Sequence, residues 1–357
     1  MTRSEKKKRY DGMLIFVVLL LVAAGLVILY STSAYNGQVK FHDPFHYLKK
    51  QGFATLLGLF GMALIARVDY HKWVPLAIPA YVTSIILSVA VIFFGDEYNG
   101  SKRWLSLGPI SFQPSEFAKV AVIFFLACLV SRNVQRMKRF RTMILMMIPV
   151  LPIVGLVGAS NLSTAIIILG IAVVLIFVAD PKYVRFILMG SIGVGFMTVF
   201  LAMESYRLER LAIWRHPELY AIGSGGLFGR GLGNSVQKLG FLPEAQNDMI
   251  FSIICEELGL IGAGFIILLF LILIWRFFVI STKASDLLGA LIAAGAMAHM
   301  MIQVILNIAV VTNSIPNTGI TLPFISYGGT SVVFLLLEMG LVLSVSNYEG
   351  LRYGGSE

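Results

Sequence analysis

Three carboxylates lie at the start of an apolar run or inside it in "FLPEAQNDMIFSIICEELG", residues 241–259. Asp248 stands where a polar loop gives way to the apolar run, whereas Glu256 and Glu257 fall inside the run. Ionisable side chains within membrane segments are costly and therefore count as functional candidates. A carboxylate at the edge of such a segment can take a proton from a polar substrate, so Asp248 is our candidate general base. Its structural alternative is a helix N-cap, a position that Asp fills well.

Helical geometry separates these three carboxylates. In a continuous helix with a rise of about 1.5 Å per residue, Glu256 lies roughly 12 Å deeper than Asp248 and about 80° around the axis. Glu257 lies about 180° around from Asp248, so the three carboxylates cannot share one site. We therefore expect Glu256 and Glu257 to have a supporting role, in which they hold their helix in place through cationic or loop donors.

A second polar group lies in "NGSKRWLSLGPISFQPSEFAK", residues 99–119. Arg103 supplies a cation near a membrane surface, and the adjacent Trp104 is typical of an interfacial anchor. Glu116 and Lys119 are three residues apart, share one face of a predicted helix and can form an ion pair. A helix with one internal ion pair explains Glu116 as well as a functional role does. For Lys119, which lies deeper in the apolar sequence, the functional role is favoured.

A glycine-rich loop, "AIGSGGLFGRGLGNS", occupies residues 221–235. Backbone N–H groups in such a loop can cradle an anion, and with Arg230 and Lys238 the loop suits a phosphate or pyrophosphate. A loop that is merely flexible is an equal alternative, because glycine frees the backbone. The preceding residues 204–215 have the pattern of an amphipathic helix with basic residues that include Arg210, and we expect this helix to lie along the membrane interface.

The fourth polar group is "NSIPNTGITLPFISYGGTS", residues 313–331, where prolines and glycines interrupt apolar sequence. Irregular backbone at membrane depth is tolerated only where it is buried in protein or lines a cavity. We therefore predict a re-entrant or tightly folded loop that borders the site. In the preceding span, Gln303 and Asn307 are expected to hydrogen-bond between helices, and His299 to be a packed polar residue and not a ligand.

The elements that must position these residues are predicted to be membrane-spanning helices. Of the 357 residues, 57% are hydrophobic and only 13% are charged, and the mean hydropathy is +0.84. Soluble domains carry about a quarter charged residues. We therefore predict an all-α polytopic membrane protein of about ten transmembrane helices, with Pro149 and Pro152 kinking the fifth. The expected spans are 13–33, 52–67, 74–94, 115–131, 142–158, 163–179, 184–203, 249–275, 287–311 and 330–346.

The distribution of positive charge predicts how these helices are oriented. Most of the 28 Lys and Arg residues fall in segments that an inside N-terminus would place in the cytoplasm, including "RNVQRMKRFR" at 132–141. The net charge of +9 therefore indicates topology and not nucleic-acid binding. We expect a cytoplasmic N-terminal basic segment at 1–12, a single ten-helix domain at 13–346 and a cytoplasmic C-terminal tail at 347–357. The outer loops are then 34–51, 95–114, 312–329 and the long loop 204–248 between the seventh and eighth helices.

The four motifs quoted above, taken in their order along the chain, resemble the SEDS family (shape, elongation, division and sporulation), which includes FtsW, RodA and SpoVE, over nearly the whole chain. The segment "NIAVVTNSIPNTGI" is more similar to the FtsW/SpoVE branch than to RodA. The chain departs from the family pattern at Asn161 in "SNLSTA", where the family carries an acidic residue. It also has a shorter loop at 215–221.

The resemblance implies a peptidoglycan glycosyltransferase that polymerises lipid II, the undecaprenyl-pyrophosphate disaccharide-pentapeptide, into β-1,4-linked strands. The reaction would take place at the outer face of the bacterial cytoplasmic membrane during cell division or sporulation. Partners would be a class B penicillin-binding protein transpeptidase and other divisome proteins. A single displacement with one base would invert the donor, by analogy with single-step glycosidases. The sequence requires no cofactor and assigns no metal ligands, but a divalent cation, Mg²⁺ or Mn²⁺, is compatible with the pyrophosphate.

By motif match, Asp248 corresponds to the essential acidic residue of the family and would be the catalytic base. Glu256 and Glu257 would support it. Substrate or pyrophosphate binding is assigned to Arg103, Glu116, Lys119, Arg210, Lys238 and the serine of "ISYGG", which is Ser326 beside Tyr327.

Two other functions compete with this one. In a lipid II flippase the same cations would bind the head group while the helices alternate access, but the chain has little two-half symmetry. A non-catalytic scaffold for the penicillin-binding protein would not need charges within the membrane, and this chain has several.

Overall fold

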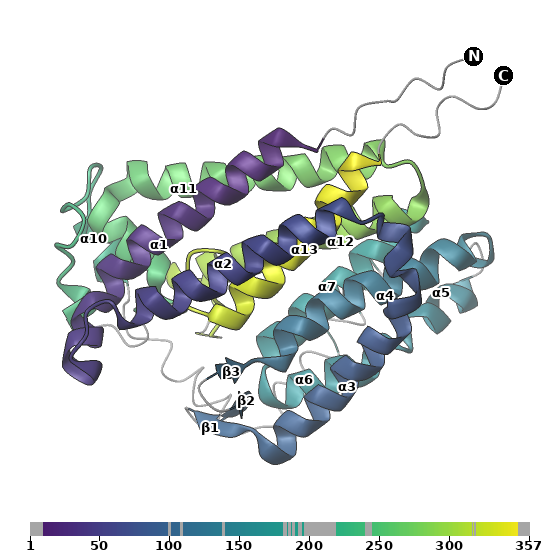
Figure 1. Ribbon diagram of the computed structural model, residues 1–357, viewed down its shortest axis with the longest axis horizontal. Helices are drawn as coiled ribbons and strands as arrows, with labels where there is room; N and C mark the ends of the chain where they lie inside the picture. Colours follow the sequence, from purple (N-terminus) through teal and green to yellow (C-terminus); the bar gives the residue numbers. More distant parts are fainter. Residues whose placement is uncertain are drawn as a thin grey trace.

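Long apolar helices dominate the computed structural model (Figure 1), because a backbone within a membrane must satisfy its own hydrogen bonds. The structure describes residues 10–98, 101–107, 110–137, 140–180, 219–239, 245–315, 317 and 319–348, with isolated positions between 184 and 195. The helices are α1 (Gly12–Phe41), α2 (His46–Arg67), α3 (Ala77–Phe94), α4 (Pro114–Met137), α5 (Phe140–Met147), α6 (Val150–Ser160), α7 (Leu162–Ala179), α10 (Leu219–Ser224), α11 (Ile250–Lys283), α12 (Leu287–Val311) and α13 (Gly329–Asn347), with 3₁₀ turns η1 (Tyr70–Leu76) and η2 (Gln237–Leu239).

The described helices overlap the predicted spans, but α1 continues to Phe41 and α11 to Lys283, each eight residues beyond the predicted end, and α2 begins at His46, so most of the predicted loop 34–51 is helical. Seven of them are long and apolar enough to cross a membrane, or up to eight if the bent pair 141–147 and 150–160 forms one span. The bend of 41° in that pair confirms the kink predicted at Pro149 and Pro152. The predicted second span lies within α2, which packs against α1 and α13. Most of the predicted span 184–203 and all of the predicted helix 204–215 lie outside the described residues, so the total of ten stays a prediction.

The prediction that the chain is all-α is wrong in one loop. Residues 95–113 form a small antiparallel sheet of β1 (Asp96–Tyr98), β2 (Ser101–Leu107) and β3 (Ile110–Phe112), in that order. The sequence signal for the first hairpin is the pair Asn99-Gly100, which favours a tight two-residue turn. The sheet places Arg103 on β2, so a strand and not a flexible loop carries this cation toward the helices.

Helix α12 is the centre of the helix bundle, where it contacts α4, α7, α11 and α13. Small residues allow α12 to pack closely against several helices at once. The helix carries "GALIAAGAMA" at 289–298, and most of this stretch is buried. A Cβ atom added at Gly295 would lie 2.6 Å from Cγ2 of Ile123 on α4, so the two helices approach too closely for a larger residue. Side chains on α12 can therefore reach neighbours on several sides.

One end of the bundle gathers the start of α1, the η1 turn, the start of α12 and the end of α13. The Asp11 N–H donates to Ser346 Oγ (3.3 Å), and the Ser344 hydroxyl donates to the carbonyl of Val68 (2.6 Å). The Tyr70 hydroxyl donates to Oδ1 of Asp286 (2.8 Å). The predicted inside segments 1–12, 66–73 and 276–286 thus contribute to the same end of the molecule.

The opposite end gathers the predicted outer loops, and we name it the outer end after that prediction. In Figure 1 the strands and α10 lie toward the left end of the view, and the ends of α1 and α2 that meet at residues 41–46 lie there too. Asn36 Nδ2 donates to Oε1 of Gln246 (3.1 Å), and Thr330 Oγ1 donates to the carbonyl of Ser111 (2.9 Å). Segments that are far apart in sequence therefore meet where the site is predicted.

At the start of α12, Asp286 is the N-cap and accepts from the Gly289 N–H (2.8 Å). Its other oxygen contacts Nε2 of His71 (2.6 Å). Burial opposes ionisation of Asp286, but the Gly289 N–H, His71 and Tyr70 all stabilise the carboxylate, and its pKa lies below the usual value. A lowered pKa means that the group stabilises the fold above its unfolded pKa of about 4 and loses this effect as the pH falls through the folded pKa.

We expect Asp286→Ala to lower the free energy of unfolding by about 1 kcal/mol, because α12 loses its cap. Asp286→Asn keeps a cap acceptor and should cost less. Thermal unfolding can be followed at each pH by the intrinsic fluorescence of the four tryptophans of the chain. The difference between wild type and Asp286→Ala should shrink as the pH falls below about 4. A difference that stays constant well below pH 4 would contradict the assignment of the effect to the carboxylate.

Candidate functional site

The segment that carries Asp248 is fixed by its backbone. Three consecutive carbonyls each accept a hydrogen bond from another part of the chain. Gln246 O accepts from the Tyr327 N–H (2.9 Å), Asn247 O from the Ser326 hydroxyl (2.6 Å) and Asp248 O from Asn307 Nδ2 (2.8 Å). Asp248 is 6% exposed and lies just before α11, whose N-cap is Met249 without a side-chain cap. The simple N-cap alternative for Asp248 therefore does not hold.

A polar stripe on α12 supplies one of these donors and extends deeper into the bundle. His299, Gln303 and Asn307 are spaced by four residues, so they follow one face of the helix, and each is buried. Asn307 Nδ2 donates to the carbonyls of Asp248 (2.8 Å) and Ile320 (2.7 Å). Gln303 Nε2 donates to the carbonyl of Thr321 (3.0 Å). The stripe thus ties α12 to both irregular segments at the outer end. Gln303 makes the expected bond between helices, through Lys119 on α4, whereas Asn307 bonds to segments outside the helices.

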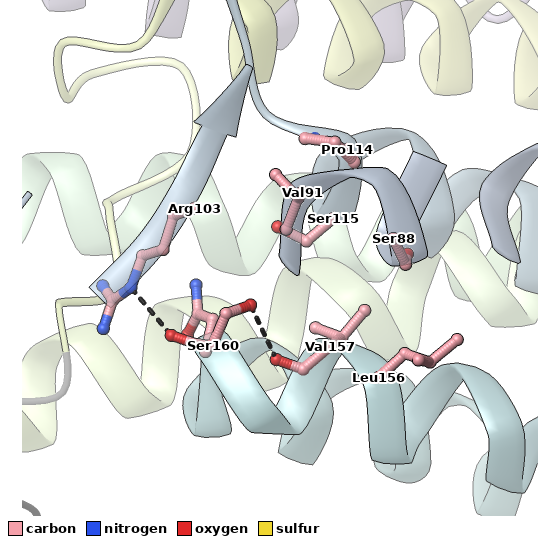
Figure 2. A pocket seen from close by; sticks show the side chains of 9 residues that line it. Ser88, Val91, Arg103, Pro114, Ser115, Leu156, Val157 and Ser160 are labelled. Atoms are coloured by element: carbon pink, nitrogen blue, oxygen red, sulfur yellow. Dashed lines mark hydrogen bonds between the residues drawn. The ribbon is translucent and has the colours of Figure 1, made fainter. Parts of the chain in front are cut away.

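Arg103 reaches from β2 to the end of α6, where its Nε donates to the carbonyl of Ser160 (3.1 Å) (Figure 2). Pro114 and Ser115 at the start of α4 lie on the same small pocket, as does Asn161. On its other side, a Cβ atom at Gly319 would lie 3.0 Å from Nη1 of Arg103. The guanidinium therefore sits between three elements at the outer end and is only partly buried.

Asn161 has a structural role at this pocket. It is the N-cap of α7, where its Oδ1 accepts from the Thr164 N–H (3.2 Å). A carboxamide caps a helix as well as a carboxylate does, so the helix start does not require a charge at this position.

Glu116 and Lys119 form the predicted ion pair, with Nζ 2.9 Å from Oε1. Lys119 also donates to Oε1 of Gln303 (2.9 Å), and Ser331 on α13 hydrogen-bonds Glu116. The Lys119 side chain is 1% exposed. In this arrangement neither charge is presented to a ligand, and both act on the packing of α4 against α12 and α13.

Glu256 and Glu257 hold a different part of the outer end. Glu256 Oε2 accepts from the Ser235 hydroxyl (2.5 Å), and its Oε1 lies 3.4 Å from Nη1 of Arg230. Glu257 Oε1 accepts from Nζ of Lys238 (2.8 Å), and its Oε2 accepts from the Ser31 hydroxyl (2.6 Å). Both glutamates thus anchor residues 225–238, which we name the glycine clamp, to α11 and α1.

The glycine clamp also provides hydrogen-bond partners at a break in α11. At Gly259 the backbone is non-helical, with φ 68° and ψ −169°, a conformation that favours glycine. Leu260 and Ile261 donate their N–H groups to the carbonyls of Gly226 (3.0 Å) and Leu227 (3.2 Å). In return, the N–H groups of Arg230 and Gly231 donate to the carbonyls of Glu256 (3.0 Å) and Glu257 (2.9 Å). Hydrogen bonds that the helix loses at the break are thereby replaced.

These contacts change the interpretation of the glycine-rich loop. The N–H groups of Gly229, Arg230, Gly231 and Gly233 all donate to acceptors within the protein, so in this arrangement they do not form an anion cradle. Nor is the loop merely flexible, because its backbone is tied to α11. Glycine is needed here for close approach: a Cβ atom at Gly225 would lie 1.9 Å from the carbonyl oxygen of Cys255.

The structure brings some predicted residues together and separates others. Lys238 is 6% exposed and paired with Glu257, away from the Asp248 segment. Ser326 is 4% exposed and holds that segment through its hydroxyl. Arg210 lies outside the described residues.

Sequence reasoning missed Gln51 on α2, whose amide donates to Ser326 O (3.3 Å) and accepts from the Gly328 N–H (3.1 Å). A lone glutamine beside the apolar part of a span was the available signal.

Within the residues that the structure describes, no group of three or more His, Cys, Asp or Glu side chains is arranged to hold a metal ion. The outer end also holds the buried side chain of Asp248, on a segment whose backbone is hydrogen-bonded, and the partly buried Arg103 on β2.

The chain is similar to known proteins over nearly its whole length. The profile of the FtsW/RodA/SpoVE family, described as cell cycle proteins, matches residues 11–350. Stage V sporulation protein E of Bacillus subtilis (strain 168) is 39% identical over 360 residues, which covers 96% of this chain and 98% of that protein. The probable peptidoglycan glycosyltransferase FtsW of Geobacter sp. (strain M18) is 34% identical over 354 residues, which covers 94% and 96%.

Solved structures share the fold. An aspartate-to-alanine mutant of the rod shape determining protein RodA of Thermus thermophilus aligns with a TM-score of 0.73 and 29% identity, over 96% of this chain and 98% of that chain. A chain from a peptidoglycan synthase complex, described as coordinating polymerization and crosslinking, aligns with a TM-score of 0.78 and 28% identity, over 96% and 99%.

We expect Glu257→Gln to destabilise the protein by about 3 kcal/mol, because the buried Lys238 ammonium loses its carboxylate. The matched control is Asp43→Asn, which removes the solvent-exposed Asp43–Lys49 pair and should leave the unfolding temperature close to that of the wild type. The variants are compared by thermal unfolding. Unfolding is followed through the reactivity of the two cysteines, which are buried in the folded protein. Equal unfolding temperatures for both variants would show that the Glu257–Lys238 pair does not anchor the glycine clamp.

Proposed function

This chain belongs to the FtsW/RodA/SpoVE family, with relatives of the FtsW/SpoVE type, and is a peptidoglycan glycosyltransferase of cell-wall synthesis; we propose that it polymerises lipid II with Asp248 as the general base. The observation that carries the proposal is the Asp248 segment, whose three successive carbonyls are each held by a donor from elsewhere in the chain. A catalytic group must be held close to its productive geometry, and such a backbone does this. The flippase and the scaffold give no reason for fixing one carboxylate in this way.

The proposed reaction is a single displacement. The Asp248 carboxylate takes the proton from the 4-hydroxyl of the acceptor GlcNAc while that oxygen forms a bond to C1 of the donor sugar. The bond from C1 to the pyrophosphate oxygen breaks, and its electron pair leaves with the undecaprenyl pyrophosphate. Attack opposite the leaving group inverts the α-linked donor to a β-1,4 product. Partial burial of Asp248 supports the assignment, because a desolvated carboxylate is a stronger base than an exposed one.

Arg103 is the residue that we assign to the departing pyrophosphate. Its guanidinium is partly exposed at the outer end and can offer several N–H donors to phosphate oxygens. Cations aimed at developing negative charge lower the barrier most in sites that exclude water. Lys119 and Glu116 are paired with each other, and Lys119 also donates to Gln303, so we assign them to ordering the start of α4. We assign Lys238 to the glycine clamp and Ser326 to holding the Asp248 segment, while Arg210 remains a proposed pyrophosphate ligand.

The substrate requires an orientation and a partner. We place both termini in the cytoplasm and the Asp248 end outside, which the positive-inside rule supports. The contact between Asp11 and Ser346 supports a common side for the two ends of the helix bundle. As partner we propose a class B penicillin-binding protein transpeptidase, in line with the complex that joins polymerization to crosslinking. Other divisome proteins would place the enzyme at its site of action. A Mg²⁺ or Mn²⁺ ion on the pyrophosphate is compatible with this scheme, but no step depends on it.

We expect Asp248→Asn to fold normally and to lower the rate of lipid II polymerisation by about 10²–10⁴-fold, because a carboxamide is not a base. The measurement is glycan formation by the reconstituted protein with a monofunctional transpeptidase, so that the partner cannot make glycan. Asp43→Asn is the control, because it removes an exposed outer carboxylate and should leave the rate unchanged. Wild-type rates from Asp248→Asn would refute the assignment of the base.

We expect Arg103→Gln to lower kcat by about 10²-fold, whereas Arg103→Lys retains the charge and should lose less. Both variants break the bond to Ser160 O, so the difference between them reports the charge and not the packing. The readout is kcat for lipid II polymerisation, with unfolding temperatures measured in parallel. Equal losses in the two variants would point to a structural role for Arg103.

A further inference from the structure

A buried polar network extends beyond the residues that the reaction uses, toward the middle of the helix bundle. His299 on α12 and Glu338 on α13 are 1% and 2% exposed, and Nδ1 of His299 lies 2.8 Å from Oε2 of Glu338. Nε2 of the same histidine lies 2.8 Å from Oε1 of Gln303. Gln303 in turn accepts from Lys119 and donates to Thr321 O. Among the hydrogen bonds of the described residues, His299 and Glu338 thus connect to the outer end through Gln303.

The partners of Gln303 fix its orientation. Lys119 can only donate, so the atom that faces it must be the amide oxygen. The carbonyl of Thr321 can only accept, so the atom that faces it must be the amide nitrogen. His299 Nε2 therefore meets an oxygen and must carry a hydrogen. This orientation holds whatever the protonation state of Glu338.

The contact between Nδ1 of His299 and Oε2 of Glu338 then contains one proton. If the Nδ1–Oε2 contact at 2.8 Å held no proton, two acceptors would face each other and a buried negative charge would remain. One proton gives either imidazolium with carboxylate or imidazole with carboxylic acid, and both arrangements are neutral overall. The charged groups that α4 presents to this pair are Lys119 and Glu116, which neutralise each other. Oε1 of Glu338 has no hydrogen-bond partner among the described residues, so His299 is the group that holds this carboxyl.

Gln303 links two segments that border the proposed site. Through Lys119 it holds the start of α4, whose Pro114 and Ser115 line the Arg103 pocket. Through Thr321 O it holds the segment that also contacts Arg103 at Gly319 and shares Asn307 with Asp248. The position of this one amide therefore sets the spacing between the cation and the carboxylate.

We propose that His299 and Glu338 form a positioning pair for the glycosyltransferase site. They fix Gln303 and, through it, the placement of Arg103 relative to Asp248. This inference rests on the function proposed above. Stability alone is a poor reason for such a pair, because replacing a buried ion pair by apolar residues of similar size is often neutral or stabilising. A positioning role predicts that stability and turnover respond differently to the replacement.

The test compares unfolding temperature with turnover. We expect His299→Leu combined with Glu338→Leu to unfold at or above the wild-type temperature, while kcat for lipid II polymerisation falls by at least about tenfold and KM changes little. A second version with His299→Phe keeps the volume of a ring. The control pair is Asp11→Asn with Arg276→Met, which removes a partly buried ion pair at the opposite end and should leave kcat unchanged. A stable double variant with wild-type kcat would overturn the proposal.

Single substitutions at Glu338 provide a second measurement that does not depend on the double variants. In Glu338→Gln the carboxamide can donate to Nδ1, so a neutral imidazole keeps its Nε2–H on Gln303 and kcat should stay within roughly threefold of wild type. Glu338→Ala leaves Nδ1 without a partner and should lower kcat by about tenfold. Equal kcat values for these two variants would overturn the proposal.

The two hypotheses fail in different ways. Normal polymerisation by Asp248→Asn, or none by the folded wild type with its partner, would refute the proposed function. Loss of activity in Asp248→Asn together with full activity in the stable His299/Glu338 double variants would refute only the positioning pair.

Discussion

Gln303 is held from three directions inside the helix bundle, and much of the outer end depends on this arrangement. A buried amide that lost one of these partners would leave a polar atom without water to replace it. The amide therefore has one low-energy orientation, and Lys119 on α4, Thr321 in the irregular segment and His299 on its own helix are placed by it. Asn307, one turn further along, extends the same constraint to Asp248 and Ile320. One face of α12 thus determines how α4, the irregular segment at 320–321 and the Asp248 segment meet.

A second constraint acts on the glycine clamp. The break of α11 at Gly259 exposes backbone groups that would be costly at the edge of a membrane, and residues 226–231 satisfy them. The two glutamates before the break then bind side chains of the same loop. Their charges serve to attach a loop to a helix, which explains why they lie in an apolar run without taking part in the chemistry proposed for Asp248.

Much of the fold was predictable from the sequence. The apolar runs located the described helices, although α1 and α11 extend eight residues beyond their predicted ends, Pro149 located the bend before α6, and the three-residue spacing predicted the Glu116–Lys119 pair. These features depend on neighbours in sequence, where helical geometry and hydrophobicity act directly. The sheet that carries Arg103 was missed because its strands are short, although Asn99-Gly100 signals the first hairpin.

The sequence by itself determined which residue types had to be buried and which of them carry charge. Only the tertiary structure decided their partners. Lys238 and Lys119 are both cations near polar motifs, yet one closes the glycine clamp on Glu257 and the other is enclosed by Glu116 and Gln303. Ser326 holds a backbone and His299 meets Glu338, 39 residues away. Such pairings depend on which helices lie side by side and how closely they approach, and that is set by small residues such as Gly295 throughout the bundle and not by any local pattern.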